Sequence, residues 1–122
     1  MGTVTVAIDA DGFSPTDASN AGYSVRCKIT GSSSYATGGD TITGALLGLG
    51  SITKLNFSGG GDAAAGAGTA AYVAIPVYDS SGVNVTKVQV FWTGAGLSGA
   101  FAEITSTTNL STIVFDATAQ GV

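Results

Sequence analysis

Alternation of apolar and polar residues at every second position is the pattern that most limits what this chain can fold into. In the segment YSVRCKI, residues 23–29, one parity carries Tyr23, Val25, Cys27 and Ile29. A period of two places successive side chains on opposite faces of a strand, so this segment predicts a strand with one buried face. The same alternation in TVTVAI near the N-terminus predicts a second such strand, followed at residues 9–22 by turn-forming residues that predict a loop.

Further β-rich runs, separated by turn signals, are ITKLNF, AYVAIPVY, NVTKVQVFW, GAFAEI and STIVFDAT. Pro76 cannot donate a ladder hydrogen bond, so its strand is expected at a sheet edge or at a bulge. The segment Thr43 to Leu49 contains two glycines and predicts a turn or a short 3₁₀ piece. Strands without intervening helices predict an all-β fold, an antiparallel β-sandwich (jelly-roll-like) of about seven to eight short strands with no substantial helix.

The length of the chain predicts one β domain over residues 1–122. Residues 1–22 are expected to form an N-terminal arm plus loop. Residues 59–71, GGGDAAAGAGTAA, are expected to form a flexible surface loop because the segment is low in complexity.

The stretch TGGDTITGALLGLG predicts a corner that carries the chain from one sheet to the other. Gly38 and Gly39 allow positive φ at the turn. The apolar residues expected to close the end of the sandwich are Ile42, Leu46, Leu47 and Leu49.

The chain is poor in charge, and this limits the partners it can have. Charged residues make up 10% of the sequence and hydrophobic residues 44%, where about a quarter charged is usual. A protein with so few charged residues is expected to be poorly soluble as a free monomer and therefore to be packed against a partner. Four basic residues and a net charge of −4 do not supply the basic face that nucleic acid requires, and they disfavour an anionic membrane.

The residue inventory argues against an enzyme. The chain has no histidine, which removes the commonest general base and the usual zinc ligand, and no cofactor is expected. The single cysteine, Cys27, is expected in the core. The glycine pattern at residues 94–99 matches a nucleotide-binding motif but lacks the helix that should follow it. Asp9 and Asp11 suggest either a weak cation site or a solvated turn, and the turn is preferred because an EF-hand loop needs further ligands.

Two aromatic features predict contacts. Phe91 and Trp92 are adjacent, so they point to opposite faces of a strand and one of them leaves the main core. That residue lies either at a strand end under a loop or at an interface. Phe13, within a polar predicted loop, raises the same question.

Several runs resemble small virion proteins of tailed bacteriophages. They are YATGGDTIT from residue 35, LLGL and ITKLNF after it, VYD before a glycine turn, VTKVQVFW, and AEITSTTNLSTIVFDATAQG. Those proteins carry a "Tyr-Pro-Thr-Gly-Gly-acid" step and an "acid-valine … aspartate-leucine-serine" step. Here Ala36 replaces the proline, Ile104 the valine and Asn109 the aspartate. The resemblance covers about four-fifths of the chain, Tyr23 to Gly121; residues 1–22 have no counterpart.

The resemblance implies a decoration (cement) protein that binds the outside of an assembled phage capsid. Its expected partners are the major capsid protein and further copies of itself, as a homotrimer. The location that the resemblance implies is the virion surface. Synthesis is expected in the host cytoplasm, because MGTVTVAIDADG lacks the features of a secretory signal. The predicted contact residues are Phe13, Pro15, Trp92, Leu97 and Phe101.

Two alternatives stay open. One is a carbohydrate-binding or adhesive module on a phage particle, with Trp92 beside Asn109 as an imagined platform. The other is a tail or baseplate component of the same class of phage.

Overall fold

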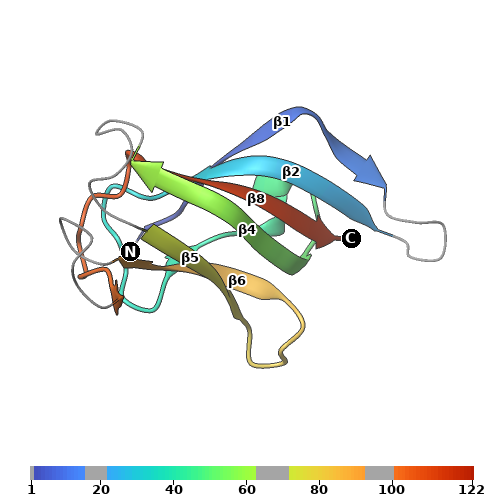
Figure 1. Cartoon of the computed structure of the whole chain (residues 1–122). Helices are drawn as coiled ribbons and strands as arrows, with labels where there is room; N and C mark the ends of the chain where they lie inside the picture. The colour runs from blue at the N-terminus through green and yellow to red at the C-terminus, as the bar shows by residue number, and fades with distance from the viewer. Residues whose placement is uncertain (1, 16–21, 63–71, 93–100) are drawn as a thin grey trace.

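Two antiparallel sheets face each other and enclose the core (Figure 1). The computed structural model describes residues 2–15, 22–62, 72–92 and 101–122, with the backbone alone at residues 10–15 and 59–62. The first sheet has the order β1-β2-β8-β4, with bounds Thr5–Pro15, Tyr23–Thr30, Ile113–Gly121 and Ile52–Asp62. The second has the order β3-β6-β5, with bounds Asp40–Thr41, Val85–Trp92 and Tyr72–Tyr78, and β7 (Ala102–Glu103) also pairs with β6. The predicted all-β, sandwich-like fold is confirmed.

The core forms because each sheet turns one parity of its strands inward. In β2 the predicted inner residues Val25, Cys27 and Ile29 are buried, whereas Tyr23 at the strand end is exposed. The opposite sheet contributes Val88 and Val90 from β6. Burying each such side chain contributes roughly 1.5–3 kcal/mol.

The prediction of a loop at residues 9–22 is wrong for residues 9–15, which continue β1. Ile8 pairs with Cys27 and Phe13 with Val25, so five steps along β1 (8 to 13) match two along β2 (27 to 25). This irregularity accommodates the turn-forming residues without ending the strand. Pro15 is tolerated because β1 is an edge strand and the residue is its last.

The described part of the predicted N-terminal arm is fixed to both sheets. The amide of Val4 donates to the carbonyl of Thr41 at 3.1 Å, and the Thr41 amide donates to the carbonyl of Gly2 at 3.0 Å. Thr3 forms an isolated parallel bridge with Thr41 of the second sheet, while β1 begins at Thr5 in the first. The segment therefore ties the two sheets together at this corner.

The prediction of a loop at residues 59–71 is wrong for residues 59–62. Strand β4 continues through residues 59–62, whose backbone pairs with β8 from Asp116 to Ile113. A strand held by its neighbour's backbone does not need side chains of its own, which is why the glycines do not end it. Residues 63–71 lie outside the described part of the chain.

The glycine-rich corner is confirmed. Gly38 and Gly39 have φ of 91° and 120°, in the region that residues with a Cβ rarely adopt. The chain then leaves β3, forms the short 3₁₀ helix η1 (Gly44–Leu47) and enters β4 in the other sheet. Three of the four predicted core residues are buried, namely Ile42, Leu47 and Leu49. The prediction for Leu46 is wrong, because its side chain is 36% exposed.

The edge position predicted for the strand containing Pro76 is confirmed, since β5 ends the order β3-β6-β5. Strand β5 turns into β6 through a short hairpin, as the sequence DSSG predicts. In this turn the Asp79 amide donates to the carbonyl of Asn84 at 2.8 Å.

The two adjacent leucines of η1 provide a test of this packing. Leu47→Ala should lower the free energy of unfolding by about 2–5 kcal/mol because Leu47 is 0% exposed. Leu46→Ala, the matched control, should change it by less than about 1 kcal/mol. Urea unfolding followed by tryptophan fluorescence measures both, and equal effects would contradict the placement of the corner.

Candidate functional site

A buried polar network fixes the corner of the second sheet. The carboxylate of Asp40, 1% exposed, accepts hydrogen bonds from the Ser32 hydroxyl at 2.7 Å and from the Ala36 amide at 3.0 Å. These bonds satisfy a carboxylate that would otherwise be very costly to bury. They also hold the Ser32 to Ala36 segment against β3.

Tyr35 connects this corner to β7. Its ring is fully buried, and its hydroxyl donates to Oε2 of Glu103 at 2.8 Å while accepting from the Val90 amide at 3.1 Å. Burial raises the pKa of the Tyr35 hydroxyl, so the group stays a donor. The same Oε2 accepts from the Gly38 amide at 2.7 Å. Glu103 therefore ties the short strand β7 to the glycine corner.

Glu103 is held in its ionised form. Desolvation alone would raise its pKa, but hydrogen bonds from the Gly38 amide, the Tyr35 hydroxyl and the Gln89 side chain outweigh it and lower the pKa below its usual value. The acid is thus a structural anchor in a site already filled by donors of this chain.

An aromatic cleft opens between β4 and β5. It has a volume of about 270 Å³ and is lined by Phe57, Ser58, Tyr72, Val73, Ala74 and Phe115. Phe57 and Phe115 meet edge to face, with centroids 5.8 Å apart and planes at 75°. Tyr72 stacks on Trp92 at 5.8 Å and 21°. Such pairs add to the stability that burial gives, so the walls of the cleft are held in place.

A second hollow, of about 460 Å³, lies at the N-terminal corner. Its lining is uncharged and mostly bears hydroxyl groups, from Thr3, Thr5, Thr30, Ser32, Ser33, Ser34 and Ser111, with Gly2 and Gly31. The hollow is open and contains neither an aromatic platform nor an ionisable group, so it offers little to hold a ligand firmly.

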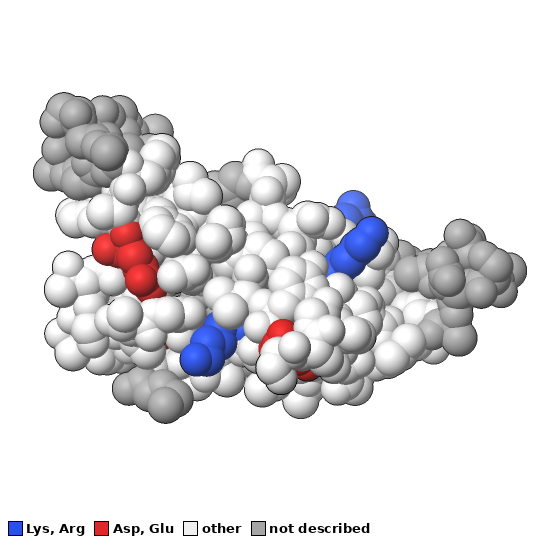
Figure 2. Space-filling view, turned by 90° about the horizontal axis from the view of Figure 1, so that it is seen from below, with Lys and Arg blue, Asp and Glu red and all other residues white. Residues whose placement is uncertain are grey.

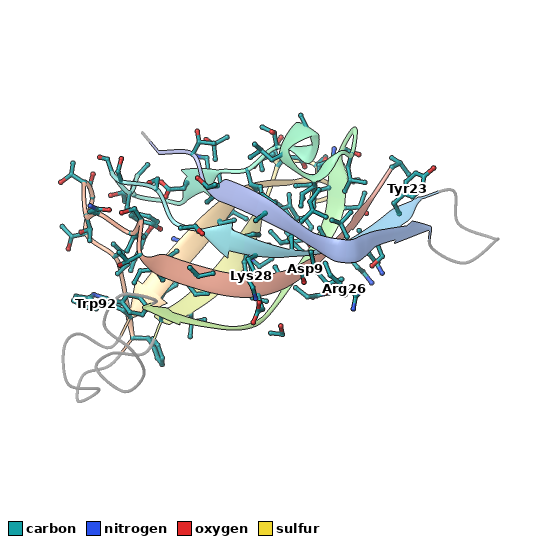
Figure 3. All side chains as sticks on the ribbon, turned by 90° about the horizontal axis from the view of Figure 1, so that it is seen from above. Asp9, Tyr23, Arg26, Lys28 and Trp92 are labelled. Atoms are coloured by element: carbon teal, nitrogen blue, oxygen red, sulfur yellow. The ribbon has the colours of Figure 1, made fainter. Side chains whose placement is uncertain are left out.

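The outer faces of the two sheets differ in character. On the first sheet, β2 projects Arg26 and Lys28 outward, and Lys28 pairs with Asp116 of β8 (Figure 3). Lys54 of β4 belongs to the same face, through its pairing with Gln120. The face of the second sheet, seen from below, is mostly uncharged, with a few charged side chains set apart from one another (Figure 2).

Apolar side chains stand on this second outer face. Val73 and Ile75 of β5 are 42% and 39% exposed, and Phe91 of β6 pairs with Val73. Phe91 therefore leaves the core, whereas Trp92 packs against it. We call the set Val73, Ile75, Val77, Lys87, Gln89, Phe91 and Glu103 the outer β5–β6–β7 face.

The structure separates the predicted contact residues into two groups. Trp92 pairs with Ala102, next to Phe101, which is 52% exposed. Pro15 pairs with Tyr23, and Tyr23 and Trp92 lie at opposite ends of the molecule (Figure 3). Phe13, two residues from Pro15, has its backbone paired with Val25. Leu97 and the glycine motif at residues 94–99 lie outside the described residues.

Within the described ranges, no group of three or more potential metal ligands is present. Asp9 lies in β1, on an exposed position, rather than in a turn. Cys27 is buried as predicted, and burial together with Asp9 raises the pKa of its thiol to about 11. Among the described residues no helix has the length and apolarity needed to span a bilayer.

No protein-family model matches this chain, and no curated protein or solved structure matches it either.

Two features of the site were not found from the sequence. The hydrogen bond between Tyr35 and Glu103 joins residues 68 positions apart, and no local sequence pattern predicts it. The outer β5–β6–β7 face did have a signal: in YVAIPVY both parities are apolar, although the strand lies at an edge. Apolar residues on both faces of an edge strand indicate a second contact surface.

The Glu103 anchor predicts a specific pH dependence. Because its pKa is lowered on folding, ionised Glu103 contributes stability above its unfolded value, about 4.3, and loses it as the pH falls through the folded value. Glu103→Gln should therefore melt at a lower temperature than the wild type at pH 7, and the difference should shrink by pH 3. Melting temperatures followed by circular dichroism measure this, and a difference independent of pH would contradict it.

Proposed function

We propose that this protein is a non-enzymatic structural protein of a phage virion that binds the outside of the assembled capsid and stabilises it. The sequence resemblance supplies the class of particle. The observation that carries the binding role is the exposure of Phe101, whose neighbour Ala102 pairs with Trp92 of the Tyr72–Trp92 stack. Large aromatic side chains on a rigid support are typical centres of protein–protein contacts.

The rigidity of this region favours binding over turnover. Strand β7, which follows Phe101, pairs with β6 and is tied to the glycine corner through Glu103. An anchor held in this way loses little conformational freedom when it docks, so more of the contact energy becomes affinity.

Stabilisation follows from mass action. A ligand that binds the assembled shell and not its separated subunits shifts the equilibrium toward assembly. Weak contacts suffice when many copies bind one particle, because each copy bridges subunits that are already held close together.

Sedimentation with shells tests the proposal. Purified protein is mixed with empty, tailless shells of the phage that carries this gene and then pelleted. The wild type should pellet with the shells, and Phe101→Ala should bind at least about tenfold more weakly, a loss of roughly 1.4 kcal/mol. Val83→Ala is the matched control: Val83 is similarly exposed, at 55%, but lies in the β5–β6 hairpin turn. It should bind like the wild type.

Other outcomes would replace the proposal. Protein that stays in the supernatant with tailless shells but pellets with whole tailed particles would indicate the tail or baseplate alternative. Quenching of Trp92 fluorescence by host polysaccharide, without shell binding, would indicate the carbohydrate-binding alternative.

A further inference from the structure

We propose that the outer β5–β6–β7 face is a pairing surface for a second copy of this chain, related to the first by a two-fold axis. This inference goes beyond the proposed function and does not rest on it. It replaces the homotrimer that the sequence resemblance implies with a two-fold pair.

The face consists of three rows that run across the strands. The first row is Val77 and Lys87, the middle row is Ile75 and Gln89, and the third is Val73, Phe91 and Glu103. The pairings in the ladder fix this arrangement, because residues directly opposite each other in a sheet project from the same face. The residue that β5 contributes to each row is apolar, namely Val77, Ile75 and Val73.

The edge of β5 is a poor route to association. Pro76 lies in the middle of this edge strand and lacks the amide proton that a neighbouring strand needs. A copy that covers Val73 and Ile75 must therefore stack on the face, as sheets do in a sandwich.

The pattern of the rows complements itself when two faces stack. The proposed two-fold axis lies in the plane between the two copies and runs along the middle row. It places Ile75 opposite Ile75 of the second copy, and it brings the first row of one copy opposite the third row of the other. Val77 then meets Val73 of the second copy. Lys87 meets the ring of Phe91 and comes near Glu103, whose Oε2 already accepts from Tyr35 and Gly38, so the cation is offered an aromatic face and the negative charge of the acid. Apolar groups meet apolar groups, and the charged group meets its complement.

This complementarity is what a two-fold contact requires, since it uses the same patch on both copies. A three-fold ring needs two different patches, and the self-complementary arrangement gives it no advantage. The aromatic residue proposed for shell binding, Phe101, precedes β7 and is not one of the face's seven residues.

Mass measurement by light scattering after gel filtration tests the pairing. The chain has a mass of 11.9 kDa, and the wild type should elute as a dimer whose dissociation appears on dilution. Ile75→Asp places two like charges opposite each other on the axis and should raise the dissociation constant at least about a hundredfold. Val83→Asp is the control and should remain dimeric. Because Ile75 is exposed, the Ile75→Asp monomer should keep the wild-type circular dichroism spectrum.

Disulfide trapping tests the position of the axis. Ile75→Cys should form a disulfide-linked dimer on mild oxidation, because this residue faces itself across the axis. Val73→Cys alone should not, whereas a mixture of Val73→Cys and Val77→Cys should cross-link. Cys27 is buried and should not interfere.

Three results would overturn the inference: a monomer at all concentrations up to about 1 mM, a trimer, or a dimer that Ile75→Asp leaves intact. Shell binding is measured separately. A monomer that pellets with shells would contradict the pairing and support the proposed function. A dimer that does not pellet would support the pairing and contradict the proposed function.

Discussion

The burial of two half-apolar sheets against each other is the constraint on which the rest of this structure depends. Each strand has only two faces, so the parity that fills the core decides what the other parity shows to solvent. In β2 burial of Val25, Cys27 and Ile29 leaves Arg26 and Lys28 outside. In β5 burial of Ala74 leaves Val73 and Ile75 outside. One packing event thus leaves charged side chains on one outer face and exposed apolar side chains, beside Lys87, Gln89 and Glu103, on the other.

The polar groups inside the molecule serve the same architecture. Asp40 and Tyr35 are fully buried, and their hydrogen bonds join segments from β3, β6 and β7. Buried polar groups of this kind stabilise one arrangement of the chain over its alternatives, because any other arrangement leaves them unsatisfied. Here they fix the position of β7, and with it the neighbouring Phe101. The ionisable residues at this corner, Tyr35, Asp40 and Glu103, are all held by hydrogen bonds from within the chain.

Local patterns predicted the fold class well. Alternation around Cys27 predicted β2 and its buried face, and the glycines at 38 and 39 predicted the corner between the sheets. These features depend on neighbours in the sequence. The extensions of β1 and β4 depend on distant partners: residues 59–62 form a strand because β8 supplies their hydrogen bonds. Leu46 and Leu47 differ in burial because of the orientation of a single helical turn, which composition does not encode. The predicted contact residues were identified by type, and their separation between the two ends of the molecule follows from topology.

Side-chain footprinting with hydroxyl radicals, applied to the protein free and bound to shells, tests the central claim that this molecule acts through its apolar surface. Phe101 and Tyr23 are both exposed, at 52% and 44%, and Tyr23 lies at the opposite end from Trp92, near which Phe101 stands. The account predicts that Phe101 loses its reactivity on the particle while Tyr23 keeps it. Equal reactivity of Phe101 in both states, or protection of Tyr23 alone, would contradict it.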